Sequence, residues 1–177
     1  QQRVGKNGRI FHIYKFRSMY LDAEERLKEL MAQNEMQGRM FKMENGPRII
    51  GSEKGPGKGI GNFIRKTSID ELPQLWNILK GDMSIIGPRP ALWNQYDLIE
   101  ERDKYGANDV MPGLTGWAQI NGRDELDIPE KAKLDGEYVK QMGFVMDVKC
   151  FLGTIAVLLK SDGVAEGGIK STKEGKE

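Results

Sequence analysis

Apolar residues recur at helical spacing in one segment near the middle of the chain. The spacing is i, i+3, i+4, i+7, which is typical of one helix face, and the residues are Leu72, Leu75, Trp76 and Leu79. Pro73 fits a helix only near its start, and Lys80-Gly81 supplies a stop signal. The pattern therefore predicts a helix that begins at about Asp70, or at Ser68 if Ser68 and Glu71 form a capping box.

The N-terminal residues show the pattern of a β-hairpin. Two β-prone runs, Arg3-Val4 and 10–14, flank Lys6-Asn7-Gly8. Asn-Gly is a strong signal for a tight turn between two strands. The sequence therefore predicts an antiparallel strand pair at this end of the chain.

The remaining segments predict helices, short strands and loops. Asp22 and Glu25 have capping-box spacing at the start of a predicted helix that ends near Gly38. Residues 45–61 are rich in Gly and Pro and predict a mobile loop. Further helices are predicted over 92–105, 129–142 and 147–159, and further strands, each with a turn, over 85–90 and 117–122.

Together these elements predict an α+β class, of mixed α and β character. We expect a mainly helical compact domain with a small antiparallel sheet or hairpin over 1–164. A flexible tail should follow over 165–177, where Gly and Lys are frequent.

Length, composition and charge fit one globular domain. The chain has 177 residues, of which 38% are hydrophobic and 30% are charged. Lys and Arg number 27 against 26 Asp and Glu, so the net charge favours no nucleic-acid partner. Residues 1–20 nevertheless hold five of these cations and no carboxylate. That local excess suits phosphate groups or an anionic membrane surface, and it suits a solvated strand pair equally well.

Rare residue types exclude several catalytic classes. Cys150 is the only cysteine and His12 the only histidine, so a disulfide framework, a His-rich metal site and a Ser-His-Asp triad do not apply. Catalysis must use carboxylates, Arg, Lys or hydroxyls. The most apolar run, 148–159, is too short to cross a bilayer. The sequence begins at Gln1 within a predicted strand, so we expect a preceding segment that holds the membrane anchor.

Asp70 and Glu71 are the candidate catalytic pair. Adjacent carboxylates at a helix start are most often a cap and its partner. In the first turn, however, unpaired N–H groups and the helix dipole favour the ionised carboxylate that a nucleophile or metal ligand requires. Arg65 and Lys66 lie just upstream and would offset the charge of an anionic substrate. The local sequence leaves both interpretations open.

Other residues are candidates for phosphate contacts. Arg89 stands between two prolines, which limit its backbone and present its guanidinium at low entropic cost. An exposed turn arginine would show the same pattern. Arg123 directly follows an Asn-Gly turn, and Asp135 and Tyr138 lie three residues apart on one face of a predicted helix.

Five motifs, in this order, resemble the bacterial sugar transferase family, the monotopic phosphoglycosyl transferases. They are KFRSM at 15–19, RKTSIDELPQLWN at 65–77, KGDMS at 80–84, GPRP at 87–90 and PGLTGWAQINGR at 112–123. The resemblance runs from Gln1 to about Val164, which is nearly the whole chain. It implies an enzyme that starts capsule, exopolysaccharide, O-antigen or glycoprotein glycan synthesis.

The resemblance implies transfer of a sugar 1-phosphate from a UDP-sugar to undecaprenyl phosphate, with release of UMP and a requirement for Mg²⁺. Asp70 matches the family nucleophile, which forms a covalent phosphosugar intermediate. Glu71 matches its helper, as a Mg²⁺ ligand or an acid/base group, and both carboxylates are candidate Mg²⁺ ligands. The chemistry agrees, because phosphoryl transfer depends on positioning and charge neutralisation and Mg²⁺ prefers carboxylate and phosphate oxygens. The sugar stays open among galactose, glucose, and N-acetylated and diamino sugars.

The site residues expected from the resemblance fall into two groups. The candidates for phosphate binding are Arg65, Lys66, Arg89 and Arg123. The supporting candidates are Asp135, Tyr138, Asp147, Lys15 and Arg17. Two departures concern a nearby loop: Gly46-Pro47-Arg48 stands where the family usually has Asp-Pro-Arg, and 51–59 resembles an insertion.

The expected partners are a UDP-sugar, undecaprenyl phosphate and the bilayer, the last reached through a re-entrant segment that precedes this chain in the family. The expected location is the cytoplasmic face of the bacterial inner membrane, with this chain soluble or peripheral, and a homo-oligomer stays open. Two non-enzymatic alternatives are a membrane-peripheral binding or scaffolding module of a glycan-assembly complex and an adaptor that uses the basic hairpin.

Overall fold

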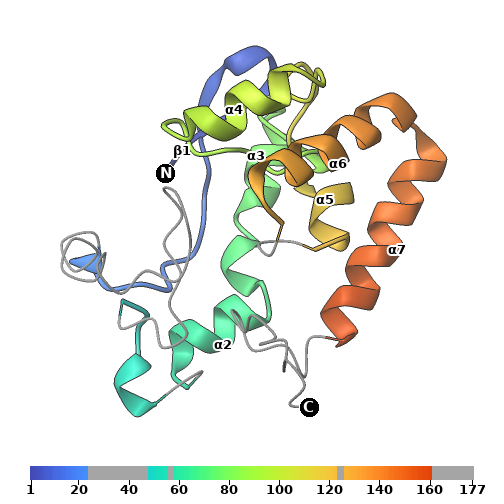
Figure 1. Ribbon diagram of the computed structural model, residues 1–177. Coiled ribbons are helices and arrows are strands. Elements are labelled where there is room, and N and C mark those ends of the chain that lie inside the picture. The colour runs from blue at the N-terminus through green and yellow to red at the C-terminus, as the bar shows by residue number, and fades with distance from the viewer. Residues whose placement is uncertain (24–47, 56–57, 123–125, 161–177) are drawn as a thin grey trace, which may run out of the picture. The chain divides into compact units, whose positions relative to one another are not determined.

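The structure is a computed structural model that describes residues 1–23, 48–55, 58–122 and 126–160 (Figure 1). The chain divides into two compact units. The first unit comprises Gln1–Phe16 and Thr67–Asp162, and the second comprises Arg17–Lys66 and Gly163–Glu177. Both candidate catalytic carboxylates belong to the first unit.

The first unit confirms the predicted mixed α+β class, with helices predominating. In the described residues its strands form two sheets of two strands each. Its elements in chain order are β1 (Gln2–Val4), η1 (Lys6–Gly8), β2 (Ile10–His12), η4 (Ile69–Glu71), α3 (Gln74–Leu79), β3 (Ser84–Ile86), α4 (Tyr96–Asp103), β4 (Gly113–Thr115), α5 (Trp117–Ile120), α6 (Ile128–Gln141) and α7 (Phe144–Lys160).

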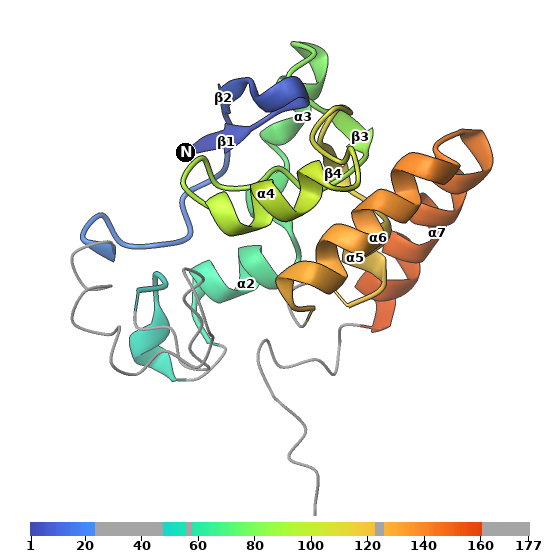
Figure 2. The same cartoon turned by 45° about the horizontal axis from the view of Figure 1, so that its top comes forward.

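The predicted hairpin is confirmed. β1 pairs antiparallel with β2, with Arg3 opposite Phe11. Asn7 and Gly8 have φ values of 55° and 74°, and this left-handed backbone explains why Asn-Gly is suited to the turn. Figure 2 shows the two strands beside the N terminus, next to α3 and α4.

The second sheet differs from the predicted one. β3 pairs parallel with β4, so the sheets are not all antiparallel. The strand predicted over 117–122 is wrong, because residues Trp117–Ile120 form the short helix α5 and the strand lies just before it. A four-residue segment with three apolar residues has too little periodicity to distinguish a strand from a helical turn.

The helix predicted to start at Ser68 or Asp70 is interrupted. A 3₁₀ turn, η4, precedes α3, and Pro73 occupies the N-cap position of α3. Ser68 has a φ of 56° and its side chain makes no capping hydrogen bond, so the predicted capping box does not form. α3 buries its polar residues Gln74 and Asn77. The apolar residues that predicted the helix are instead exposed: Leu72, Leu75, Trp76 and Leu79.

Three longer helices complete the first unit. α4 is shorter than the predicted 92–105, whereas α6 and α7 lie close to their predicted ranges. α6 begins after Asp127, whose side chain accepts a hydrogen bond from the Glu130 N–H at 2.8 Å, a standard N-cap contact. A small core joins α6 to α7 and contains Tyr138, Met146 and Cys150. Within the described ranges no helix is both long enough and apolar enough to cross a bilayer.

The second unit is described over fewer residues. It contains η3 (Ser52–Lys54) and α2 (Ile60–Lys66), and an isolated bridge joins Met19 to Ile49. The sequence did not predict α2, since its first turn lies within the Gly- and Pro-rich stretch. The predicted helix over 22–38, apart from its first two residues, and the predicted tail lie outside the described residues.

The close approach of Gly113 in β4 to Gly87, the residue after β3, yields a first prediction. A Cβ at Gly113 would lie 2.1 Å from the Gly87 nitrogen, a distance that the backbone must relieve by moving. We expect Gly113→Ala to lower the free energy of unfolding by about 1–3 kcal/mol, measured by urea denaturation.

Gly143→Ala is the matched control. A Cβ at Gly143 would meet no atom within 4 Å, and its backbone does not need a positive φ. We expect this variant to keep the wild-type midpoint. Equal midpoints for the two variants would contradict the close backbone approach of β3 and β4.

Candidate active site

Asn77 positions the chain that leaves the hairpin. Its side-chain oxygen accepts a hydrogen bond from the Tyr14 N–H at 3.0 Å, and its amide nitrogen donates to the His12 carbonyl at 2.8 Å. Asn77 is 0% exposed, so these contacts are shielded from water. The Phe16 N–H donates to the Asp70 carbonyl at 2.9 Å. These contacts tie both flanks of Lys15 to α3 and η4.

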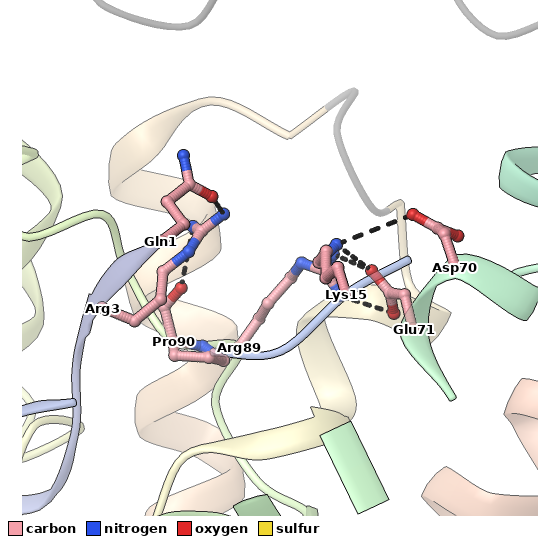
Figure 3. Close-up of polar contacts among 7 residues, drawn as sticks. All are labelled: Gln1, Arg3, Lys15, Asp70, Glu71, Arg89 and Pro90. Carbon is pink, nitrogen blue, oxygen red and sulfur yellow. Dashed lines mark hydrogen bonds and ion pairs between the residues drawn. The ribbon is translucent and has the colours of Figure 1, made fainter. Parts of the chain in front are cut away.

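Lys15 and Arg89 converge on Glu71. The Lys15 Nζ lies 2.7 Å from the Glu71 Oε1. The Arg89 guanidinium reaches both carboxylate oxygens, with Nη2 at 2.5 Å from Oε1 and Nη1 at 3.3 Å from Oε2. In Figure 3 dashed lines run from the Lys15 ammonium to Glu71 and to Asp70, whose Oδ2 is 4.0 Å away. We call Lys15, Asp70, Glu71 and Arg89 the carboxylate cluster.

The charges of the carboxylate cluster shift its pKa values. Burial alone would raise the pKa of Glu71, but the charges and hydrogen bonds of Arg89 and Lys15 outweigh burial and lower the pKa to about 2. Burial lowers the pKa of Lys15, and the charge of Glu71 opposes part of that shift. The carboxylate of Glu71 is therefore ionised at neutral pH.

Asp70 lies in a 3₁₀ turn, 4.0 Å from the Lys15 ammonium. η4 has only three residues, so the dipole predicted from a long helix is largely lost. Asp70 is 7% exposed and shares the Lys15 ammonium with Glu71. A carboxylate beside an ammonium can act as a nucleophile toward a phosphate without the full repulsion between two anions.

Arg3 is a member of the site that the sequence did not single out. Its Nη1 donates to the Pro90 carbonyl at 3.2 Å, and its Nη2 donates to the Gln1 side-chain oxygen at 2.8 Å. Burial and the nearby charge of Arg89 lower the pKa of Arg3 to about 10. The cationic end of the site therefore contains a second guanidinium, on β1.

The supporting residues predicted on α6 and α7 do not join the carboxylate cluster directly. Asp135 is 0% exposed and forms an ion pair with the buried Arg102 of α4. The Tyr138 hydroxyl donates to the Asp147 Oδ1 at 2.8 Å, which links α6 to α7. Burial and the Asp147 carboxylate raise the pKa of Tyr138, so it stays protonated. These three side chains therefore link α4, α6 and α7 within the first unit.

Four other predicted site residues lie outside the described part of the first unit. Arg17, Arg65 and Lys66 belong to the second unit. In that unit burial lowers the pKa of Arg48, and the charge of Arg65 lowers it further. Arg123 lies outside the described residues. Phosphate binding by Arg65, Lys66 and Arg123 and a supporting role for Arg17 stay predictions.

Asp70 and Glu71 are the carboxylates of the cluster that could hold a metal. No group of three or more His, Cys, Asp or Glu suitable for a metal occurs in the described part of the chain. Mg²⁺, however, commonly takes one or two protein carboxylates and completes its shell with water and substrate phosphates. The donor set fits that kind of ion, and it does not fit a site built by the protein alone.

Sequence patterns missed Arg3, Asn77 and Arg102. Arg102 had a usable signal, because it follows the buried Leu98 by four residues and so lies on the buried face of α4. A charged residue on such a face requires a partner. Arg3 and Asn77 act on backbone carbonyls far along the sequence, and no local pattern reports such contacts.

A compact site of paired carboxylates, lysine and arginine is typical of proteins that handle phosphate groups. The model of the bacterial sugar transferase family matches residues 1–161. The chain belongs to this family.

Several curated proteins are similar to this chain over most of its length. A galactosyl transferase CpsE of Streptococcus agalactiae is 47% identical over 164 residues, covering 92% of this chain and 34% of that protein. An undecaprenyl-phosphate galactose phosphotransferase of Salmonella typhimurium is 41% identical, covering 92% and 33%. An undecaprenyl-phosphate glucose phosphotransferase of Komagataeibacter xylinus is 39% identical, covering 88% and 28%. The chain spans about a third of the length of these relatives.

The lowered pKa of Glu71 predicts a specific pH dependence of stability. Its folded-state pKa of about 2 lies below the ordinary 4.5, so its ionisation stabilises the fold above about pH 4.5 and this contribution is lost as the pH falls toward 2. We expect the free energy of unfolding of Glu71→Gln to be about 2–3 kcal/mol lower than that of wild type at pH 6. This difference in free energy should narrow below pH 4.5.

Urea denaturation at a series of pH values measures this gap. Lys15→Met with Arg89→Met removes both cations, and in that background Glu71→Gln should no longer unfold more easily than its parent at pH 6, because burial alone raises the pKa of Glu71. A gap that stays constant from pH 6 to pH 2 in the otherwise wild-type protein would contradict the assigned ion pairs.

Proposed function

We propose that the protein transfers a sugar 1-phosphate from a UDP-sugar to undecaprenyl phosphate and releases UMP. The observation that supports this most is the carboxylate cluster, in which Lys15 lies within 4.0 Å of both Asp70 and Glu71 while Arg89 binds Glu71. Such a cluster joins a nucleophile to cations that bind phosphates. The named relatives act on undecaprenyl phosphate with galactose or glucose, which fits the same reaction class.

The reaction is proposed to proceed in two displacements at phosphorus. An Asp70 carboxylate oxygen attacks the β-phosphorus of the UDP-sugar and forms an O–P bond. The bond between that phosphorus and the bridging oxygen breaks, and UMP leaves with the electron pair. A phosphate oxygen of undecaprenyl phosphate then attacks the same phosphorus, which releases Asp70 and gives undecaprenyl diphosphate-sugar.

The neighbouring residues have separate roles in this proposal. Lys15 offsets the negative charges of Asp70 and the incoming diphosphate. Arg89 has the planar geometry for two hydrogen bonds to a phosphate, as it makes two to Glu71 in this structure. Glu71 holds both cations at the site before the substrate arrives.

A bound Mg²⁺ is proposed to be held by Asp70 and Glu71 together with substrate phosphates. When bound it would neutralise phosphate charge and stabilise the leaving group. To accept it, Glu71 must exchange part of its contact with Lys15 and Arg89. Those cations would then be available to the diphosphate.

The proposed location is the cytoplasmic face of the bacterial inner membrane, where a polyprenyl phosphate is found. Membrane attachment through a segment outside this chain is part of the proposal. The relatives named for galactose and glucose make a hexose the first sugar to test.

The direct test is detection of the intermediate. Membranes that contain the full-length protein are incubated with UDP-galactose or UDP-glucose and Mg²⁺, without acceptor, and peptides are analysed by mass spectrometry. We expect a hexose phosphate adduct on the peptide that contains Asp70. Asp70→Asn should lose the adduct and lower turnover by at least about 1,000-fold, since it removes the nucleophile.

Asp109→Asn is the control, because it changes an exposed carboxylate outside the carboxylate cluster. It should keep both adduct and turnover. Turnover that persists in Asp70→Asn would contradict the covalent mechanism. A protein that binds undecaprenyl phosphate without any turnover would support the non-catalytic binding module instead.

Arg89→Lys tests the proposed phosphate contact. Lysine keeps the charge but cannot make two parallel hydrogen bonds to one phosphate. We expect kcat/KM for the UDP-sugar to fall by about 10–100-fold, while the melting temperature changes by only a few degrees. Unchanged kcat/KM in steady-state assays would show that Arg89 does not contact the donor.

A further inference from the structure

We propose that the buried ion pair of Arg102 and Asp135 is a positioning pair, which fixes the backbone of the 87–91 segment and so sets the Arg89 guanidinium against Glu71. Arg102 lies on α4 and Asp135 on α6, 33 residues apart in sequence. Arg102 contacts the carboxylate cluster at the backbone carbonyl of Arg89. The effect on transfer rests on the proposed function, whereas the effect on the segment does not.

The guanidinium of Arg102 is divided between a carboxylate and a backbone carbonyl. Its Nε and Nη2 lie 2.8 Å and 2.6 Å from the Asp135 Oδ2. Its Nη1 donates to the Arg89 carbonyl at 2.8 Å. A lysine could not make all three contacts, because its donors radiate from one nitrogen atom. The geometry therefore couples Asp135 to the backbone of Arg89 through one rigid group.

The segment around Arg89 depends on such contacts because it belongs to no helix or strand. Two of its residues are prolines, which have no N–H to donate. Four successive carbonyls accept hydrogen bonds from outside the segment: Pro88 from the Gly113 N–H, Arg89 from Arg102, Pro90 from Arg3, and Ala91 from the Val4 N–H. Two of these four donors are arginine side chains.

The pair is buried between closely packed segments. Arg102 is 3% exposed and Asp135 is 0% exposed. α6 approaches closely, since a Cβ at Gly136 would lie 2.6 Å from the Tyr105 Cβ. Burial raises the pKa of Asp135 and the charge of Arg102 opposes that shift. Taking two charges out of water is costly, so a buried pair is better explained by the geometry that it imposes than by stability alone.

Two variants separate positioning from folding. Arg102→Lys keeps the charge opposite Asp135 but loses the shared guanidinium. Arg102→Met combined with Asp135→Leu removes both charges, and such replacements of a buried pair commonly preserve stability. Leu98→Ala is the control, because Leu98 is buried on α4 one turn before Arg102 and its loss weakens the same helix.

Hydrogen exchange of the full-length protein, measured by mass spectrometry, reads the segment directly. We expect the amides hydrogen-bonded from or to this segment, those of Gly87, Val4 and Gly113, to exchange at least about 10-fold faster in Arg102→Lys and in the double variant, because the segment opens locally. Leu98→Ala should exchange at the wild-type rate in this segment. Wild-type exchange there in both pair variants would overturn the proposal, whatever the protein catalyses.

Transfer assays test whether the pair acts through Arg89. In the wild-type background we expect each pair variant to lower kcat/KM for the UDP-sugar by about 10-fold or more. In an Arg89→Ala background the same changes should cost less than about twofold, because the guanidinium that they position is absent. Equal losses of kcat/KM in the wild-type and Arg89→Ala backgrounds would show that the pair does not act through Arg89. Wild-type protein without transfer activity would contradict the proposed function, and hydrogen exchange would still decide the positioning.

Discussion

The ion pairs of Glu71 with Lys15 and Arg89 are the interaction on which the site depends. Two cations and two carboxylates stay close together because each charge has an opposite charge within 4.0 Å. Burial makes this compensation necessary, since an unpaired charge at the same place would be costly. Lys15 and Arg89 are already held in place by Glu71, so they can bind a phosphate substrate with little further reorganisation of the site.

The scaffold behind the carboxylate cluster combines directional polar contacts with a small apolar core of Phe11, Ile13 and Met83. Asn77 fixes the chain beside Lys15, and Arg102 and Arg3 fix the chain beside Arg89. α3 buries the side-chain amides of Gln74 and Asn77 and packs Ile78 against this core, while its other apolar side chains are exposed. Such contacts have strict directions, so they specify geometry where packing alone would allow several arrangements.

The sequence predicted those elements whose causes are local. Asn7-Gly8 predicted the hairpin through its left-handed backbone, and Asp127 and the following turn are consistent with the predicted α6. It also named the four residues of the carboxylate cluster, partly through family resemblance. It failed in two places. The positive φ of Ser68 interrupts a helix that the apolar spacing predicted. The partner of Asp135 lies 33 residues away in the sequence, so no local pattern could name it. Local periodicity carries no information about such partners.

The most direct measurement of the central claim is an experimental structure of the full-length protein with a UDP-sugar and Mg²⁺. The account predicts the diphosphate against Arg89 and Lys15, with the β-phosphorus facing the Asp70 carboxylate and about 3–3.5 Å from one of its oxygens. A diphosphate bound away from Asp70, with Glu71 still closed on both cations, would contradict it.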